Sequence, residues 1–455
     1  MLLPTKSRLP ELYPHRHGLY FAFYNALNWQ VGAGTPTVLL MEQLGADSFQ
    51  VGLVYSWVFL LTPVQVLATA WLPRLGYKRL TLAGWGARGW FLLLPLSLAL
   101  LAPEQPAGWM IPAMVAAMFF YSLSRSVGAA AITNWLHGLI PEPIRGRYWT
   151  TDQMLAGVGA VGMLLLGALL FAVLPAYPAF AIQYLIAILG AWMSWRYLNR
   201  LPDIDRPKVL SLEKIVADTP RLVLEPSQFR TYLWLAALLF VVTTPIVPFG
   251  TYYLKATAGL TSAHIMFYMM LYYAGVIGAN AFMRSRLDRV GAKPFFRLSF
   301  VTYGVAAAGW MAFLYAGRGA GLILPLLFLL LGAAAACWTS ANLNYLAKLL
   351  PAQERALPLS IHGAVIAFLG GVSPVIWGLF LKGEGPVPAV NVPVFAAFFG
   401  VVIVAMVCLH RLTAVLEEKA GPVEPLLDGS WLLRPFRIMT DLINLVDRSD
   451  DGRKD

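Results

Sequence analysis

The sequence predicts an all-α protein that crosses a membrane many times. Hydrophobic residues make up 58% of the 455 residues, mean hydropathy is +0.65, and only 13% of residues are charged. A soluble domain usually carries about 25% charged residues. Twelve apolar segments of about 20 to 29 residues follow one another along the chain, each long enough to cross about 30 Å of hydrocarbon. Segments of this length, without alternation of apolar and polar residues, favour transmembrane helices and exclude a β-barrel.

The predicted spans fall into two sets of six. The longest polar stretch between spans, 198–230, is expected to be a cytoplasmic linker between an N-terminal half over 19–197 and a C-terminal half over 231–411. Residues 1–18 are expected to form a cytoplasmic N-terminus and residues 412–455 a cytoplasmic tail. The spans are expected at 19–41, 50–72, 80–102, 108–136, 151–174, 178–197, 231–254, 262–284, 295–317, 320–347, 361–382 and 389–411.

Membrane topology accounts for most of the net charge of +11. With a cytoplasmic N-terminus, thirty of the 34 Lys and Arg residues fall in cytoplasmic segments. Lys255, Arg318 and Lys382 fall near the outer side, and Arg125 is the one basic residue placed inside a span. This is the positive-inside pattern, with both termini in the cytoplasm. We therefore expect a lipid bilayer, and no nucleic acid, as the surroundings of this protein.

Several functional classes lack their sequence signatures. No phosphate loop or catalytic triad is present, and the two cysteines and six histidines show no metal-ligand spacing. We therefore expect no enzyme activity, no metal, no cofactor and no ATP-driven step. The N-terminus lacks the apolar core and cleavage site of a signal peptide, so the first span is expected to act as the insertion signal.

The tail contains one apolar stripe with helical periodicity. Its apolar residues recur at spacings of 4, 3, 4 and 3, at Leu432, Phe436, Met439, Ile443 and Val446. This pattern predicts an amphipathic helix that lies along the inner membrane surface or against the bundle. A docking site for a partner is the alternative.

A short basic motif occurs once in each half. LPRLGYKRL at 72–80 and LDRVGAKPF at 287–295 both connect the second and third span of their half. LIPEPIRGRY at 139–148 matches LLPAQERALP at 349–358, which aligns Arg145 with Arg355. Two homologous six-helix halves are expected of a transporter whose binding site lies between them.

With these features the chain resembles the major facilitator superfamily over residues 15–411. The loop signature of that family is well matched in the second half and is incomplete in the first, where Pro73 replaces the acidic residue. The resemblance implies that this loop pairs with neighbouring helix ends and latches the outward-open state, while simple positive-inside anchoring is the alternative. Gly76 and Gly291 suit a tight turn that needs a backbone without a Cβ. The matching positions are Arg74, Gly76, Lys78, Arg79, Asp288, Arg289, Gly291 and Lys293.

Arg125 is the most informative residue inside a predicted span. It lies about 17 residues from the outer end of the fourth span, which is near the bilayer midplane at about 1.5 Å per residue. A charge there costs at least about 2.5–3.5 kcal/mol, so it is expected to face a cavity or a partner. An anionic substrate can pair with the guanidinium, or backbone carbonyls can hold it structurally. The surrounding SLSRSVGAAA resembles a motif of proton-linked exporters, but the Gly-Pro ending of their fifth span is absent.

Candidates for proton coupling are few, because no Asp or Glu is expected at the midplane of a span. Asp152 lies near the inner end of the fifth span and His362 near the inner end of the eleventh. Both are candidates for coupling, although a structural role is the simpler reading of a single histidine.

Amides and hydroxyls within the spans are candidates for substrate contacts. The resemblance implies that the first, fourth, seventh and tenth spans line a central cavity. Hydrogen bonds between helices, worth about 0.6 kcal/mol each, are the alternative role. The candidates are Asn25, Asn28, Gln30, Thr243, Thr244, Asn280, Ser340, Asn342 and Asn344.

We therefore expect a secondary active transporter of a small organic solute that works by alternating access. Proton-coupled efflux, suggested by the motif around Arg125, and organic-anion uptake, suggested by the lack of midplane carboxylates, both remain open, as does a co-transported proton or ion. A non-transporting protein of the same fold, used for membrane-complex assembly or lipid and pigment handling, is the alternative. The short loops favour the inner membrane of a bacterium, and we expect a monomer.

Overall fold

The computed structural model describes residues 11–101, 104, 106–204, 212–283, 286–316, 322–350, 356–382 and 390–417. Regular structure in these residues is helical, apart from a single bridge between Lys382 and Val390. The all-α prediction is therefore confirmed. The amphipathic stripe predicted at 432–446, together with Arg318 and Arg355, lies outside the described residues.

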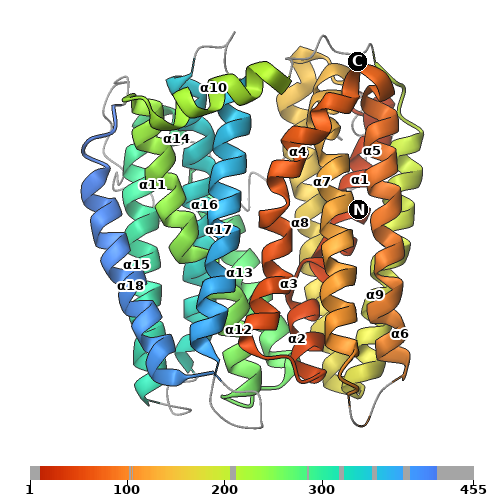
Figure 1. Cartoon of the computed structure of the whole chain (residues 1–455), viewed down its shortest axis with the longest axis vertical. Helices are drawn as coiled ribbons and strands as arrows, with labels where there is room; N and C mark the ends of the chain where they lie inside the picture. Colours follow the sequence, from red (N-terminus) through yellow and green to blue (C-terminus); the bar gives the residue numbers. More distant parts are fainter. Residues whose placement is uncertain are drawn as a thin grey trace, which may run out of the picture.

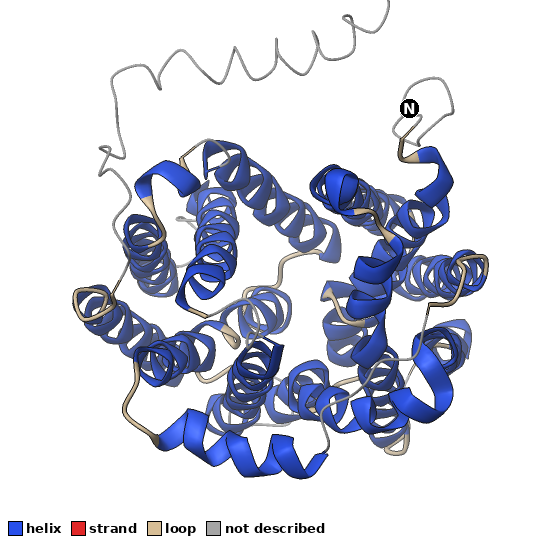
Figure 2. Ribbon diagram, turned by 90° about the horizontal axis from the view of Figure 1, so that it is seen from above, coloured by secondary structure: helices blue, strands red, loops and turns tan. Residues whose placement is uncertain are grey.

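The helices form two bundles that stand side by side (Figure 1), and Figure 2 shows the same bundles from above. The first bundle contains η1 (Tyr13–His15), α1 (Arg16–Gly32), α2 (Thr35–Gln43), α3 (Ser48–Leu60), α4 (Thr62–Ala68), η2 (Thr69–Trp71), α5 (Leu72–Phe91), α6 (Leu93–Leu101), α7 (Met110–Leu139), α8 (Glu142–Val173) and α9 (Ala176–Asn199).

The second bundle follows the linker helix α10 (Leu212–Leu224), which lies across one end of the molecule in Figure 1. We call this the α10 end, and the opposite end, which holds Asp47, the Asp47 end. The second bundle contains α11 (Gln228–Thr243), α12 (Ile246–Ala256), α13 (Ser262–Met283), α14 (Leu287–Val290), α15 (Lys293–Ala316), α16 (Leu324–Leu349), α17 (Ala356–Leu381) and α18 (Val392–Leu412).

Ten helical stretches are long and apolar enough to cross a membrane. One of them, Ser48–Leu101, covers two of the predicted spans. The first predicted span is not among the ten, because it is split into α1 and α2. The protein is therefore a multi-pass membrane protein, while the count of twelve spans and the side of the termini stay predictions.

The break between α1 and α2 has a local cause. Gly34 has φ −108° and ψ −162°, and Pro36 lies in the first turn of α2, where its missing N–H costs no hydrogen bond. The hydroxyl of Thr37 donates to the carbonyl of Val31 at 2.7 Å, which satisfies a backbone group that the break leaves free. A side-chain donor of this kind lets a broken helix persist in an apolar environment.

The two bundles meet mainly through α3 with α17, α8 with α13, and α2 with α12. Glycines allow the backbones of α3 and α17 to approach each other closely. A methyl group at Gly52 of α3 would lie 2.3 Å from the Pro374 carbonyl oxygen, and one at Gly378 of α17 would lie 2.8 Å from the Ser48 carbonyl oxygen. The backbones of α3 and α17 are therefore in direct contact near the Asp47 end.

The repeated basic loop has the same backbone conformation in both bundles. Gly76 has φ 76° and ψ 170°, and Gly291 has φ 87° and ψ 179°. Residues other than glycine rarely adopt this region. The tight turn predicted at both positions is therefore present.

Candidate functional site

Arg125 of α7 lies half-buried beside α1 and α3. Its guanidinium carbon is 4.6 Å from the centre of the Trp29 ring, and Nη1 donates to the Val58 carbonyl at a long 3.5 Å. Among the described residues Arg125 forms no ion pair. The guanidinium therefore keeps donors that a bound acceptor can use.

A second arginine, Arg88 of α5, lies inside a span, so placing Arg125 alone there was wrong. Arg88 is 1% exposed, and its Nη2 donates to Asn25 Oδ1 at 2.7 Å and to Ser194 Oγ at 3.3 Å. Its guanidinium carbon lies 4.8 Å from the centre of the Trp85 ring. A charge count over the predicted span 80–102 would have found it.

Asn25 and Asn28 are occupied by contacts inside the first bundle. Asn25 Oδ1 accepts from Arg88 and also from Trp85 Nε1 at 3.3 Å. Asn28 is fully buried; its amide donates to the Ala187 carbonyl at 3.1 Å and its oxygen accepts from Tyr121 Oη at 2.8 Å. Both amides thus brace α1 against α5, α7 and α9 near the arginines.

Gln30 joins the two bundles at the level of this site. Its amide nitrogen donates to the hydroxyl of Tyr273 on α13 at 2.5 Å. Gln30 is 5% exposed, while Tyr273 is half-buried. Gln30 is adjacent in sequence to Trp29, which contacts Arg125, so this contact between the bundles lies next to the Arg125 site.

Among the candidates on the second bundle, Ser340 and Asn280 bond to each other, whereas others bond to residues outside the candidate set. Ser340 of α16 donates to Asn280 of α13 at 2.8 Å, and Asn280 is exposed. Asn342 instead accepts from Tyr232 at 2.5 Å, and Thr243 donates to the carbonyl of Leu239 in its own helix. The half-buried residues Thr244 and Asn344 complete the set.

The two coupling candidates lie in separate bundles and are both buried. Asp152 of α8 is 7% exposed and accepts from Gln153 Nε2 at 3.3 Å. His362 of α17 is 3% exposed and stacks on Tyr232 with ring centres 5.6 Å apart. Its Nε2 has no hydrogen-bond partner in the described part of the chain.

The loop residues differ in how firmly they are held. Lys78 Nζ donates to the Leu201 carbonyl at 2.8 Å, which ties the loop to the segment that follows α9. Arg74 and Arg79 are exposed. Lys293 is half-buried at the start of α15. The backbone is described for Arg145, Asp288 and Arg289, but their side chains lie outside the described part.

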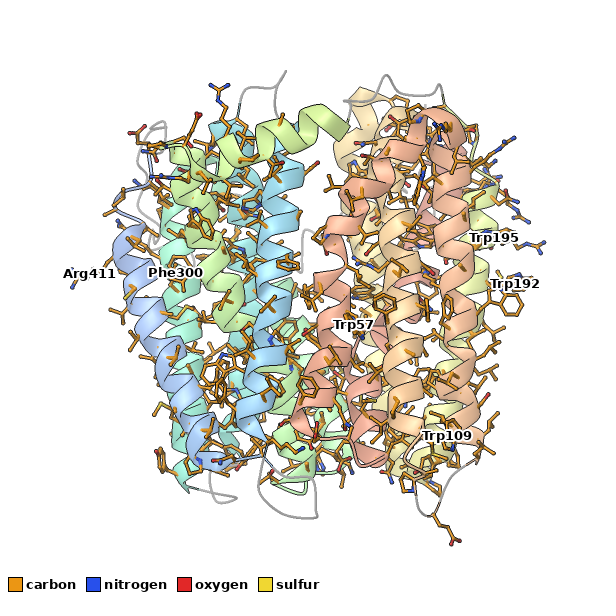
Figure 3. All side chains as sticks on the ribbon, in the orientation of Figure 1. Trp57, Trp109, Trp192, Trp195, Phe300 and Arg411 are labelled. Carbon is orange, nitrogen blue, oxygen red and sulfur yellow. The ribbon has the colours of Figure 1, made fainter. Side chains whose placement is uncertain are left out.

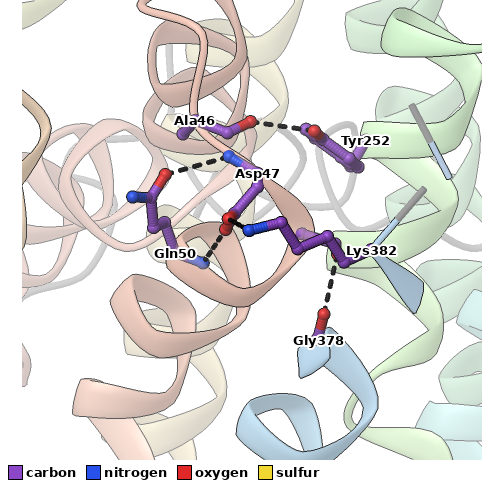
Figure 4. Close-up of polar contacts among 7 residues, drawn as sticks. Ala46, Asp47, Gln50, Tyr252, Gly378 and Lys382 are labelled. Atoms are coloured by element: carbon purple, nitrogen blue, oxygen red, sulfur yellow. Dashed lines mark hydrogen bonds and ion pairs between the residues drawn. The ribbon is translucent and has the colours of Figure 1, made fainter. Parts of the chain in front are cut away.

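Polar contacts join the two bundles at the Asp47 end (Figure 4). Lys382 Nζ lies 2.9 Å from the Asp47 carboxylate, and Ser48 Oγ donates to the Gly378 carbonyl at 2.7 Å. The hydroxyl of Tyr252 donates to the Ala46 carbonyl at 2.8 Å. The sequence does not indicate these contacts, because each joins residues more than 200 positions apart.

Neither a protein-family model nor a curated protein matches this chain. Solved structures do match. The nucleoside transporter NupG has a TM-score of 0.63 and 14% identity, with 87% of this chain and 98% of that chain covered. The xylose transporter XylE from E. coli, in an inward open conformation, has a TM-score of 0.64 and 14% identity over 90% and 96%.

A third similar structure is a bacterial homologue of the iron transporter ferroportin in an inward-facing state, with a TM-score of 0.66 and 13% identity over 90% of this chain and 98% of that chain. At such low identity these likenesses establish the fold and leave the substrate open. The two-bundle arrangement and these structural likenesses together show that the chain has the fold of the major facilitator superfamily of transporters.

Proposed function

We propose that this protein is a secondary transporter of a small organic solute, and that Arg125 contacts an anionic or strongly hydrogen-bond-accepting group of that solute. The single observation that carries this proposal is the state of Arg125. It is half-buried between helices of one bundle and has no acidic partner among the described residues. Keeping a charge within a membrane bundle is costly, so such residues commonly serve a transport pathway.

The contrast with Arg88 strengthens this assignment. Arg88 is fully buried and donates to two side chains, whereas Arg125 has one long bond to a carbonyl and a ring beneath it. Trp29 contacts one face of the guanidinium by a cation–π interaction, which does not occupy the in-plane donors that the bond to Val58 leaves over. We assign Arg88 to the scaffold, together with Asn25 and Asn28, and Arg125 to the solute.

The distribution of contacts between the bundles supports alternating access. Apart from the bond between Gln30 and Tyr273, the hydrogen bonds and the ion pair that join the bundles among the described residues gather at the Asp47 end. Asn280 and Thr339, which lie toward the α10 end, are exposed. We propose that the α10 end is cytoplasmic, because the basic residues concentrate there. The conformation then corresponds to a state closed outside and open inside, and two of the similar structures carry such a description.

Within this proposal the repeated loops and the buried titratable groups keep their expected roles. The loops around Gly76 and Gly291 are proposed to guide movement between states, and Asp152 and His362 are proposed as coupling groups. Asn280 and Ser340 are the second bundle's proposed solute contacts, because Asn280 is exposed and accepts a hydrogen bond from the half-buried Ser340.

Thermal stabilisation of the purified protein tests the role of Arg125. Organic anions, cations and neutral solutes are screened against the wild type, Arg125→Gln and a control, Arg221→Gln, which removes one charge from the exposed linker helix. A ligand at 100 times its Kd should stabilise the native state by about 2.7 kcal/mol. We expect an anion to stabilise the wild type and the control but to lose its effect on Arg125→Gln.

Two other results would change the proposal. A cationic or neutral ligand that stabilises Arg125→Gln as well as the wild type would keep transport and remove Arg125 from the solute site. No stabilising ligand, combined with no uptake of any screened solute into proteoliposomes, would contradict the transport proposal and favour the non-transporting alternative.

A further inference from the structure

A groove runs between α15 and α18 on the flank of the second bundle that faces away from the first. Its volume is about 830 Å³. Its floor includes Phe300 and Met406, which are 0% and 2% exposed, and Val301, Val305 and Val407 on its sides are exposed. Figure 3 shows Phe300 on α15 and Arg411 projecting from α18 at this flank.

Gly304 leaves space in the groove because it has no side chain. A methyl group at Gly304 would meet only Met406 Cβ, at an ordinary contact distance of 3.7 Å. A larger side chain at this position would therefore extend into the groove without disturbing the backbone. Ala308, one helical turn further along α15, continues the same narrow apolar surface.

Basic groups gather at the end of the groove nearest the α10 end. Arg297 lies in the first two turns of α15, and His410 and Arg411 lie in the last turn of α18. Arg297 Nε donates to Thr413 Oγ1 at 3.0 Å, which fixes the guanidinium and leaves its two terminal nitrogens available. His410 Nδ1 is buried without a hydrogen-bond partner in the described residues. This end of the groove therefore suits an anion.

The length of the groove matches one leaflet of a bilayer. Arg297 and Ala308 are eleven residues apart on α15, which corresponds to about 16 Å of helix. The hydrocarbon of one leaflet is about 15 Å thick, half of the 30 Å core. A charged group held at Arg297 would therefore lie at headgroup depth, with an apolar chain reaching the middle of the bilayer beside Ala308.

We propose that this groove binds an anionic phospholipid, with its phosphate on Arg297 and Arg411 and an acyl chain along Gly304 and Ala308. A lipid of this kind satisfies both the apolar groove and its basic end. Basic pockets between transmembrane helices bind anionic headgroups in this way. An apolar face of a second copy would fill the groove but leave the arginines without partners.

Native mass spectrometry of the full-length protein tests the proposal with phosphatidylglycerol and phosphatidylcholine of identical acyl chains. We expect the wild type to retain phosphatidylglycerol preferentially. The double variant Arg297→Gln/Arg411→Gln should bind it about 30-fold more weakly, since each basic contact contributes about 1 kcal/mol. The control Arg221→Gln/Arg230→Gln removes two charges from the same end and should bind like the wild type. Equal retention of both lipids, or unchanged binding by the Arg297/Arg411 variant, would overturn the proposal.

A second variant, Gly304→Leu, keeps both arginines and fills the groove. It should also lose phosphatidylglycerol. That loss would distinguish a lipid bound in the groove from lipid that associates non-specifically with the basic residues. Wild-type binding by Gly304→Leu would place the lipid elsewhere and overturn the proposal. A lipid-free dimer that becomes a monomer in Gly304→Leu would also overturn it, because the groove would then be an interface between copies.

Discussion

The ammonium nitrogen of Lys382 lies 2.9 Å from the Asp47 carboxylate and joins the end of α17 to the start of α3 across the two bundles. The same carboxylate caps α3, because its Oδ1 accepts from the backbone N–H of Gln50 at 2.9 Å. Gln50 returns the contact by accepting from the Asp47 N–H at 3.0 Å. One side chain therefore both starts a helix and holds the bundles together at this end.

Substitutions at Asp47 should separate these two roles. Asp47→Asn keeps a good capping side chain but removes the ion pair, and should cost about 0.2–1 kcal/mol because Lys382 is largely exposed. Asp47→Ala also removes the cap and should cost about 1 kcal/mol more. Chemical unfolding in detergent measures both, with Lys382→Gln as the partner control for Asp47→Asn. Equal costs for the Asn and Ala variants would show that the cap contributes nothing.

Separating α3 from α17 should open the Asp47 end. In Gly52→Ala the new methyl group would lie 2.3 Å from the Pro374 carbonyl oxygen, so the helices must move apart. Gly162→Ala is the matched control, because nothing lies within 4 Å of its new methyl group. The readout is alkylation of Ser48→Cys by a membrane-impermeant maleimide, in a chain with Cys408→Ser.

Ser48 is 1% exposed, so the cysteine should react slowly in the parent chain and in Gly162→Ala, and several-fold faster in Gly52→Ala. Equal rates in all three chains would mean that the contact between Gly52 and Pro374 does not keep this end closed.

The two buried arginines should differ in their effect on stability. Arg88→Leu removes a buried donor from both Asn25, which keeps only the longer bond from Trp85, and Ser194, and should cost about 1–3 kcal/mol of unfolding free energy. Arg125→Gln loses mainly the contact with Trp29 and should cost about 0.5–1 kcal/mol. Unfolding of each variant in the same detergent measures the difference. A larger loss in Arg125→Gln would reverse the roles assigned to the two residues.

A double-mutant cycle can then test the bond itself. Asn25→Ala combined with Arg88→Leu should be less destabilising than the sum of the single variants by about 0.5 kcal/mol or more, because the two side chains share one hydrogen bond. Exact additivity would mean that the bond between Asn25 and Arg88 does not contribute to stability.

The sequence was sufficient to predict the helices and the repeated glycine turn, because both depend on local properties. Length and hydropathy decide whether a segment can span a bilayer, so most of the predicted spans coincide with helices of the structure. The matching motifs at 72–80 and 287–295 placed Gly76 and Gly291 in equivalent turns, and their dihedral angles agree within 11°. The split of the first span between Gly32 and Thr35 was missed, because single glycine and proline residues are common within membrane helices.

The site was harder to predict, because its side chains are paired by tertiary structure. The sequence identified Asn25 and Asn28 as polar residues on one helix face, but their partners lie 63 and 159 positions away, on α5 and α9. Arg88 was counted with the cytoplasmic charges, although it lies well inside a predicted span. No pattern in one sequence distinguishes a guanidinium that is enclosed by partners from one that remains available, which is the difference between Arg88 and Arg125.

The repeated glycine turn should respond in the same way to substitution in both bundles. Gly76 and Gly291 combine a positive φ with a ψ near 180°, a region that is nearly restricted to glycine, so Gly76→Ala and Gly291→Ala should each cost about 1–3 kcal/mol. Asparagine should not restore stability at either position, because it tolerates the left-handed helical region and not this one. Gly400→Ala in α18 is the control; its methyl group meets nothing within 4 Å, and helix propensity should make it neutral or stabilising. Thermal unfolding measures all five variants. A large cost at Gly76 with none at Gly291 would show that the two loops, despite their equal geometry, do not contribute equally to the fold.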